Sequence, residues 1–305
     1  MNTSTRRDFL KQAALGAATM ALPSLAAAAP ESKGSGPSAY AVFTKHFLGL
    51  SHEQLADTLA ELGITAIEAP IRPKGHVEPA KVADELPKFV EILKKRGIEI
   101  EVLTSGINSV SPEQHTETVL RTARALGIPR YRMDWYNYDL KKPIWPQLDE
   151  IKPKLKELVA FSKEVGIQPC YQNHSGPKLV GAPIWDMATL MRDYSPAELG
   201  WCFDIMHTTI EGSTSWPIEV DLVRDHIAVA YFKNFMWEGK THKPAPLGEG
   251  VVGPNYVEML KKTNYNGPVS LHIEYLKGSI KDPGYLAEAK AATKRDMDVL
   301  KSWWA

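Results

Sequence analysis

Short runs of apolar, β-branched and aromatic residues alternate along this chain with longer segments whose apolar residues recur every three to four positions. The short runs predict buried strands, and the longer segments predict amphipathic helices. The strands are predicted at residues 40–47, 64–70, 98–108, 130–136, 168–174, 200–207, 228–235 and 269–275.

Helix boundary signals fall between these runs. A Ser-x-x-Gln segment, Ser51 to Gln54, predicts the start of one helix, and Ser111 with Pro112 and Glu113 predicts another. Glycines that follow a predicted helix and precede a strand are expected at left-handed helix ends; they are Gly97, Gly127, Gly166 and Gly267.

Repeated strand-then-helix units without a change in composition predict a single (β/α)8 barrel, an α/β TIM barrel that spans residues 38–305. A doubly wound open sheet is the alternative. The first strand is not followed by G-x-G-x-x-G, and the sequence contains no P-loop, so a nucleotide-binding sheet has little support.

The N-terminus resembles an export signal. The segment from Ser4 to Lys11 contains Arg6-Arg7 before Phe9-Leu10, and an apolar run and a small-residue stretch follow at 13–22 and 26–29. Residues 1–29 are therefore predicted to be a twin-arginine signal peptide, and 30–37 a linker. We expect export of the folded protein by the twin-arginine machinery to the periplasm. The apolar run is too short to span a membrane, so no membrane association is expected after cleavage.

The charge balance limits the classes of partner. The chain has 36 basic and 36 acidic residues, with neither a basic cluster nor an acidic tail. Nucleic acid and membrane surfaces are therefore not expected as partners. Small molecules fit better, and an exported protein is expected to meet few phosphorylated substrates.

The two cysteines, Cys170 and Cys202, lie on neighbouring predicted strands. A disulfide directly between adjacent strands is strained, so two buried free thiols are predicted.

Polar residues gather at the C-terminal ends of the predicted strands, which is where barrel enzymes carry their chemistry. They are Lys45, His46, Glu68, Asn108, Asp134, Tyr136, Gln172, Asn173, His174, Asp204, His207, Tyr231, Lys233, Asn234, His272 and Glu274. Buried polar groups are unfavourable unless they are paired or used.

Strand alternation places several of these residues on the inner face. If Asp204 and Glu274 point inward, His272 points inward one layer below Glu274, and Tyr231 shares a face with Lys233. The residues then expected around one volume are Glu68, Asp204, Glu274, His174, His207 and His272. Such oxygen and imidazole groups suit a divalent Mn, Mg or Zn ion, and the carboxylates are equally suited to proton transfer.

Four segments resemble the sugar phosphate isomerase/epimerase family, the xylose isomerase-like TIM barrels that also include endonuclease IV. They are Phe203-Asp204-Ile205-Met206-His207, Ile67-Glu68-Ala69-Pro70, His272-Ile273-Glu274-Tyr275 and Pro246-Leu247-Gly248-Glu249-Gly250. The resemblance covers residue 38 to the C-terminus. It implies a divalent metal held by a fifth-strand Glu, the sixth-strand Asp, a seventh-strand His and the eighth-strand Glu.

This chain departs from that pattern at two positions, where Gln172 replaces the Glu and Tyr231 replaces the His. An amide oxygen is a weaker ligand than a carboxylate, and Tyr ligates poorly until it is deprotonated. We expect a metal held by Asp204, Glu274, Gln172 and His272, with His174 or His207 as the alternatives to His272. In the alternative, the metal is weak or absent and Lys233 supplies the positive charge.

The resemblance implies an enzyme that moves a proton next to the carbonyl of a sugar or an oxidised sugar derivative, and the predicted export favours an unphosphorylated one. Glu274 and Glu68 are then the base and acid, and the metal or Lys233 stabilises the enediolate. The expected substrate-binding residues are His207, His174, Asn173, Trp237, Trp135 and His46.

Isomerase or epimerase activity is the leading hypothesis for the function of this chain. A lyase or hydratase acting on 3-keto glycosides and a non-catalytic sugar-binding barrel are the alternatives. The pair Glu68 and Glu274 favours an enzyme over a binding protein. A phosphodiesterase like endonuclease IV needs more His and Asp metal ligands than the strand ends offer.

Overall fold

The computed structural model describes residues 36–305. The predicted signal peptide, 1–29, and most of the predicted linker, 30–37, lie outside the described residues. Within the described part of the chain, no helix is long and apolar enough to cross a membrane.

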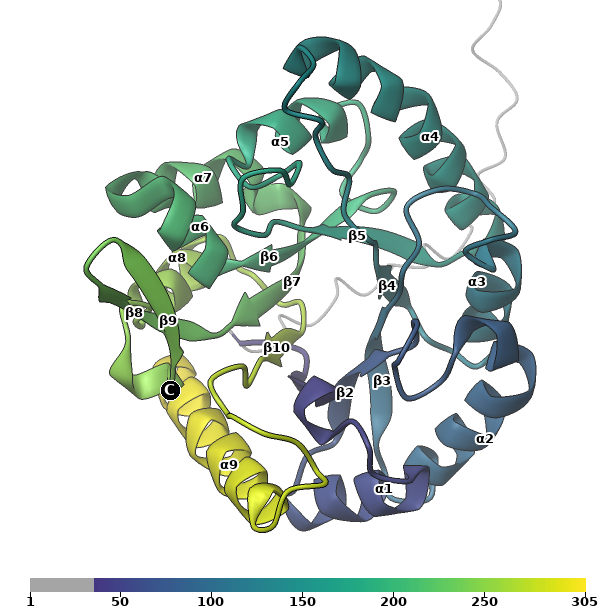
Figure 1. Cartoon of the computed structure of the whole chain (residues 1–305), viewed down its shortest axis with the longest axis vertical. Helices are drawn as coiled ribbons and strands as arrows, with labels where there is room; N and C mark the ends of the chain where they lie inside the picture. The colour runs from purple at the N-terminus through teal and green to yellow at the C-terminus, as the bar shows by residue number, and fades with distance from the viewer. Residues whose placement is uncertain (1–35) are drawn as a thin grey trace, which may run out of the picture. The chain divides into compact units, whose positions relative to one another are not determined.

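The described residues form a closed barrel of parallel strands, so the predicted (β/α)8 fold is confirmed. Around the barrel the strands follow the order β1-β10-β7-β6-β5-β4-β3-β2, and the helices surround them (Figure 1). The strands are β1 (Tyr40–Phe43), β2 (Ala66–Pro70), β3 (Glu99–Thr104), β4 (Arg130–Arg132), β5 (Gln168–Gln172), β6 (Gly200–Asp204), β7 (Ile227–Phe232) and β10 (Val269–Leu271).

The α-helices cover the outer face of the barrel. They are α1 (His52–Glu61), α2 (Val82–Lys94), α3 (Thr116–Ala125), α4 (Ile144–Val165), α5 (Trp185–Met191), α6 (Ile205–Gly212), α7 (Trp216–Val223), α8 (Asn255–Lys262) and α9 (Tyr285–Trp304). The predicted start of α1 is confirmed, because Ser51 and Gln54 form a reciprocal capping box.

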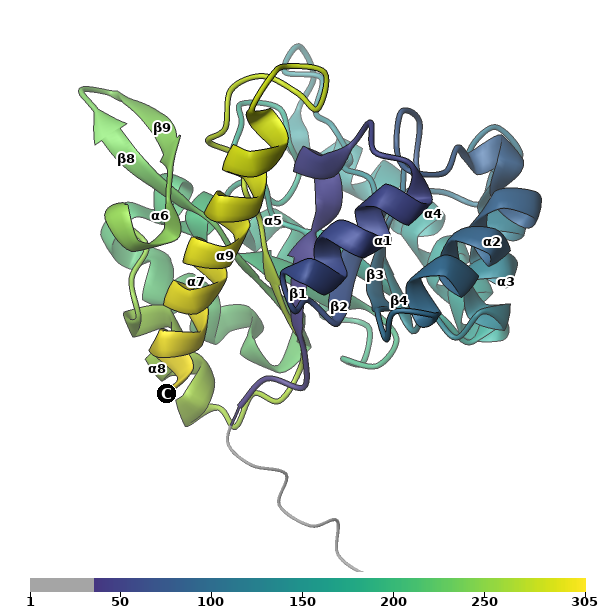
Figure 2. The same cartoon turned by 90° about the horizontal axis from the view of Figure 1, so that it is seen from below.

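Each of the eight predicted barrel strands is present, but most end earlier than predicted. After Phe43 the chain forms a 3-10 helix, η1 (Thr44–Phe47), and after Asp204 it enters α6 directly. A hairpin that the sequence analysis missed, β8 (Asn234–Glu238) and β9 (Thr241–Ala245), follows β7. Figure 2 shows this hairpin at the same end of the barrel as the loop that leads into α9.

Three of the four predicted helix-ending glycines are in the left-handed region, with φ values of 68°, 88° and 80° at Gly97, Gly127 and Gly166. Gly267 is not. After α8 the left-handed residue is Asn264, with φ 55°. At Gly267 a Cβ would lie 2.9 Å from the carbonyl oxygen of Ala228, so close backbone approach explains that glycine.

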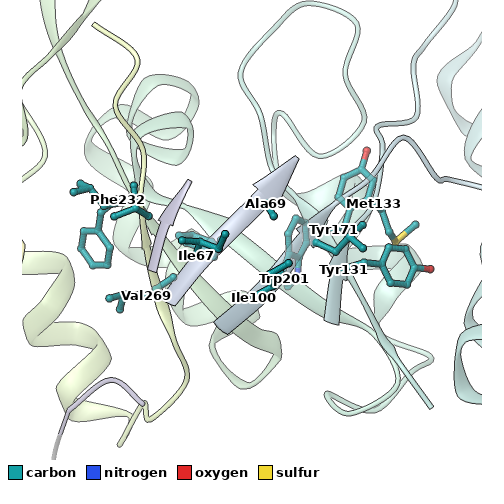
Figure 3. Close-up of a cluster of buried hydrophobic side chains, with 14 of the residues drawn as sticks. Ile67, Ala69, Ile100, Tyr131, Met133, Tyr171, Trp201, Phe232 and Val269 are labelled. Atoms are coloured by element: carbon teal, nitrogen blue, oxygen red, sulfur yellow. The ribbon is translucent and has the colours of Figure 1, made fainter. Parts of the chain in front are cut away.

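Alternation along the strands separates two buried layers. Ile67, Tyr171 and Trp201 point toward the helices and belong to the main hydrophobic core (Figure 3). The interior of the barrel holds a smaller apolar cluster that consists of Val102, Cys170, Cys202, Val229 and Tyr231. The two cysteines are free and buried, as predicted.

One buried carboxylate outside the barrel mouth predicts a pH-dependent stability. Glu219 on α7 is buried, and its Oε2 has no hydrogen-bond partner. Burial, with a smaller contribution from Glu211, raises the pKa of Glu219 from 4.5 to about 7. The folded state holds this proton more tightly than the unfolded chain, so stability falls as the pH rises from 4.5 to about 7.

We therefore expect Glu219→Gln to raise the melting temperature more at about pH 8 than at about pH 4.5. Thermal unfolding followed by circular dichroism at the two pH values measures this difference. Exposed Glu258 on α8 provides the control, because Glu258→Gln removes a surface charge only. An equal effect of the two substitutions would contradict the interpretation.

Candidate active site

A buried lysine links two carboxylates at the C-terminal ends of the barrel strands. Asp204 ends β6, Lys233 follows β7, and Glu274 follows β10. The Nζ atom of Lys233 lies 3.1 Å from Oδ2 of Asp204 and 3.0 Å from Oε2 of Glu274. Burial alone would lower the pKa of Lys233, but the two carboxylates raise it above its ordinary value. The structure thus places an ammonium ion between these carboxylates.

Glu274 is the accessible carboxylate of this group. Its side chain is 24% exposed, whereas those of Asp204 and Glu68 are fully buried. Oε1 of Glu274 accepts a hydrogen bond of 3.3 Å from Lys45, a half-exposed residue of η1. Burial would raise the pKa of Glu274, but Lys233, followed by His272 and Lys45, lowers it far below its ordinary value. Glu274 is therefore an ionised carboxylate that solvent and ligands can reach.

Glu68, on β2, is enclosed by other side chains. Its Oε1 accepts a hydrogen bond from Thr104, and its Oε2 accepts one of 2.8 Å from Ser270 and contacts Nε2 of His272 at 3.0 Å. Burial would raise the pKa of Glu68, but His272 and then Arg132 outweigh it and lower the pKa to about 2. Its oxygens are thus occupied by neighbouring side chains.

Gln172 and Arg132 connect the two carboxylate groups. Nε2 of Gln172 donates to Oδ2 of Asp204 over 2.8 Å, and Oε1 of Gln172 accepts from Arg132 over 2.8 Å. Arg132 also lies 3.7 Å from Glu68. The sequence analysis missed Arg132. Arg132 could have been found from the alternation of side chains along a strand. It is two positions before Asp134, so both side chains are expected on the same face of the predicted strand.

Two histidines lie beside Lys233. The ring centroids of His174 and His207 are 3.7 Å apart, and Nδ1 of His207 contacts Oγ of Ser175 at 2.8 Å. Burial, then the positive charge of Lys233, lowers the pKa of both histidines, so both are neutral at pH 7. Nε2 of His207 is buried, has no hydrogen-bond partner and lies 3.7 Å from Asp204. It is the unused polar atom of this part of the site.

Two residues predicted to bind substrate, Asn173 and His46, have hydrogen-bond partners within the protein. The amide of Asn173 is buried and bonds to the backbone N–H and C=O of Asp204 and to the hydroxyl of Thr208. His46 lies on η1 with its Nε2 atom 2.9 Å from Thr293 of α9. Burial lowers the pKa of His46 to about 3. Lys45, rather than His46, is the residue of this turn that reaches Glu274.

The two tryptophans predicted to bind substrate occupy different surroundings. Trp135 packs edge-on against His174 and donates a hydrogen bond to the backbone carbonyl of Gln172. Trp237 lies on the β8–β9 hairpin, is 47% exposed and packs against Phe235. Together with Trp216, it lines a cavity of about 300 Å³ whose lining does not include Asp204, Lys233 or Glu274.

A family model described as the xylose isomerase-like TIM barrel matches residues 56–303. The chain belongs to this family. Significant similarity to a curated protein sequence was not found. Family membership agrees with the closed barrel and with the position of the polar residues at its C-terminal mouth.

Three solved structures illustrate the fold of this xylose isomerase-like barrel. A probable 3-DHS dehydratase involved in petrobactin synthesis from Bacillus anthracis is 15% identical, with a TM-score of 0.66 over 86% of this chain and 98% of that chain. D-psicose 3-epimerase from Clostridium cellulolyticum is 12% identical, with a TM-score of 0.63 over 86% and 99%. A xylose isomerase-like TIM barrel protein from Mycobacterium smegmatis, solved in complex with magnesium, is 18% identical, with a TM-score of 0.56 over 83% and 89%. At these identities the likeness shows the fold alone.

The site of this family member does not fit the metal expected from the sequence. The ammonium group of Lys233 lies between Asp204 and Glu274, where it pairs with both expected acidic ligands. Gln172 directs its NH₂ group to Asp204 and its oxygen to Arg132. His272 contacts Glu68. Within residues 36–305, no group of three or more His, Cys, Asp or Glu side chains is placed to hold a metal ion.

The seventh-strand position also departs from a metal site. The hydroxyl of Tyr231 is buried in the apolar interior layer without a hydrogen-bond partner. Burial raises the pKa of Tyr231 well above its ordinary value, so the phenol stays protonated and is a poor ligand.

Proposed function

We propose that this protein is a sugar isomerase or epimerase-like enzyme that moves a proton at a carbon next to a carbonyl. The contact between Lys233 and Glu274 is the observation that carries the proposal. An accessible carboxylate and a buried ammonium group at one point provide the base and the electrophile that this reaction needs.

Lys233 supplies the stabilising charge in this proposal. An ammonium group has three N–H donors, and Lys233 directs two toward Asp204 and Glu274. The third can donate to the carbonyl oxygen of a bound sugar. When Glu274 removes the proton from the neighbouring carbon, the electron pair moves to that oxygen, and Lys233 stabilises the resulting enediolate. For isomerisation, Glu274 returns the proton to the former carbonyl carbon, and the proton of the adjacent hydroxyl moves to the former carbonyl oxygen. For epimerisation, a proton must reach the original carbon from the opposite face.

His207 is proposed to hold a sugar hydroxyl through its unpartnered Nε2 atom. His174 and Trp135, which pack against one another beside it, form the adjoining wall. Asp204 fixes Lys233 and is itself held by Gln172. Gln172 is therefore proposed to position Lys233 indirectly.

One observation favours β-elimination as the second candidate reaction. Epimerisation by two bases needs a second free carboxylate, and Glu68 is fully buried with its oxygens occupied by Thr104, Ser270 and His272. Elimination of a group β to a carbonyl needs a single base at the carbon, with Lys233 stabilising the same enolate. A fold neighbour described as a probable 3-DHS dehydratase is consistent with this reaction class.

The predicted metal becomes the alternative to Lys233 as the electrophile. A bound Mn, Mg or Zn ion would have to displace Lys233 from Asp204 and Glu274, two contacts that the structure contains. We therefore propose a metal-independent reaction. We also propose export by the twin-arginine pathway and a periplasmic carbohydrate substrate, on the basis of Arg6-Arg7 and the segments that follow.

Protein freed of metal by a chelator tests both parts of this proposal. It would be incubated with a panel of free, acidic and 3-keto sugars, and the products would be identified by NMR. We expect conversion at the same rate before and after addition of Mn, Mg or Zn, and no rise in melting temperature with these ions. New stereochemistry at one carbon indicates epimerisation, a moved carbonyl indicates isomerisation, and an unsaturated product indicates elimination.

Two outcomes would contradict the proposal. Conversion of a sugar only after metal is added would show that the metal, rather than Lys233, stabilises the enediolate. Binding of sugars without conversion of any of them would identify a sugar-binding barrel that lacks catalysis.

A further inference from the structure

A cavity of about 580 Å³ lies at the ends of the first four barrel strands. This volume is in the range of protein sites for small molecules. Its lining includes Lys45, Ile71, Arg72, Ser105, Gln114 and Asp134. Lys45 belongs both to this cavity and to the active site, because its Nζ atom contacts Glu274 at 3.3 Å.

Arg72 is the unusual residue of this cavity. Its guanidinium carbon lies 6.0 Å from the centre of the Phe43 ring, and that of Arg132 lies 5.4 Å from the same ring. Within residues 36–305, the side chain of Arg72 has neither an ion pair nor a hydrogen bond in the structure. Burial and the nearby charge of Arg132 lower the pKa of Arg72 from its ordinary value. A half-buried guanidinium group with five unpaired donors is a ready site for an anion.

The loop that carries Arg72 is held in one conformation. The N–H groups of Gly75 and His76 donate to the carbonyl oxygens of Arg72 and Pro70, each over 2.8 Å. A Cβ at Gly75 would meet the Pro70 oxygen at 2.4 Å, so only glycine fits this turn. Arg72 is thus presented to the cavity by a tight turn, which limits the entropy lost when a ligand binds.

We propose that Arg72 and Lys45 bind the carboxylate of a sugar acid whose reactive carbon lies at Glu274. This inference rests on the proposed function and names the class of its substrate. A planar guanidinium group matches the two oxygens of a carboxylate, and half-exposed Lys45 adds a second cation. The cavity is also lined by a third cation, Lys74, and by two carboxylates, Asp134 and Glu113, so three cations less two carboxylates leave one formal positive charge. A singly charged carboxylate therefore fits better than a dianionic phosphate.

Binding of a carboxylate would also change Glu274. In the free protein Lys45 contributes to lowering the pKa of Glu274, after Lys233 and His272. If Lys45 turns to the substrate carboxylate, Glu274 loses its contact with this ammonium group and keeps the one with Lys233, so its Oε1 atom is free to face the substrate carbon. Substrates that lack the carboxylate would leave Lys45 on Glu274.

Calorimetric titration of the mature protein with D-glucuronate, D-glucose and D-glucose 6-phosphate tests the inference. We expect glucuronate to bind at least about tenfold more tightly than either of the other two. Arg72→Met should remove this preference while the binding of glucose stays unchanged. Lys81→Met is the matched control, because Lys81 is an exposed cation nearby that does not line the cavity. Arg72→Lys should keep part of the preference, which guards against a folding defect in the methionine variant.

Equal binding of glucuronate and glucose, a preference for the phosphate, or an unchanged preference in Arg72→Met would each overturn the carboxylate subsite. So would the absence of measurable binding of all three sugars. These failures are distinct from failure of the proposed function, because the preference for glucuronate over glucose is measured as binding by the wild-type protein, whether or not that protein catalyses a reaction. Turnover of neutral sugars with no acid preference would support the proposed function and contradict this inference.

Discussion

Replacing Glu274 with glutamine is expected to lower kcat by about a hundredfold or more. Glutamine keeps the size of the side chain and can still bond to Lys233 and Lys45, but it cannot accept a proton from carbon. Substrate binding should therefore survive, so that kcat and kcat/KM fall by similar factors. Steady-state kinetics on whichever substrate the panel identifies, together with calorimetric binding, measure both quantities.

Glu68→Gln separates a chemical role from a structural one. Glu68 is fully buried and occupied by Thr104, Ser270 and His272, so this substitution should lower stability more than Glu274→Gln does. If Glu68 acts as the second acid or base, its replacement should lower kcat as much as that of Glu274. A near-normal kcat in Glu274→Gln would show that Glu274 is not the base.

Removing the ammonium group of Lys233 is expected to lower the free energy of unfolding by about 3–5 kcal/mol at pH 7. Lys233→Met leaves Asp204 and Glu274 without their shared cation, and a buried charge that has lost its partner is strongly destabilising. Chemical denaturation at several pH values measures the loss. It should shrink in acid, because the lowered pKa of Glu274 contributes its full stability above the pKa of the unfolded chain and loses it progressively as the pH falls below that value.

Lys45→Met is the matched control for this second prediction. Lys45 also contacts Glu274, but its side chain is 50% exposed, so its replacement should change the free energy of unfolding by less than about 1 kcal/mol. Similar losses for the two variants would contradict the special position of Lys233. Stabilisation of Lys233→Met by methionine packing would contradict it as well.

The barrel itself could be predicted because buried parallel strands leave a strong pattern. The runs around Ile67, Tyr171 and Trp201 have large apolar side chains that face the helices, and their spacing repeats with each strand. The strand ends were predicted too far along the chain. Lys233 continues the alternation that begins at Tyr231, although the chain has already left β7 there, and His207 lies three residues into α6 rather than on a longer β6.

The composition of the site was more predictable than its contacts. The alternation of side chains along the strands placed Asp204 and Glu274 at the mouth of the barrel. It did not show that the long side chain of Lys233 reaches between them. Lysine has four rotatable bonds, so its charge can lie far from its Cα atom. The expectation of a metal depended on the presence of Asp204 and Glu274, and the ammonium group of Lys233 lies between these two carboxylates.

Turns after the strands explain the remaining differences between the predicted and the observed side-chain contacts. Continuing the strand from Phe43 would place Lys45 on the same inner face, whereas the sequence analysis selected His46. The 3-10 helix η1 instead directs His46 to Thr293 and Lys45 to Glu274. Arg72 follows β2 in a tight loop, and neither periodicity nor composition indicates that an arginine in such a loop has no partner.

Incorporation of solvent deuterium into the substrate is the most direct test of the central claim that Glu274 and Lys233 move a proton without a metal. Chelator-treated wild-type protein and Glu274→Gln would be incubated with substrate in D₂O, and the label at the carbon next to the carbonyl would be followed by NMR. We predict that the wild-type protein incorporates label and that Glu274→Gln does so at least about a hundredfold more slowly. Undiminished incorporation by Glu274→Gln, or incorporation by the wild type only after metal is added, would contradict the account.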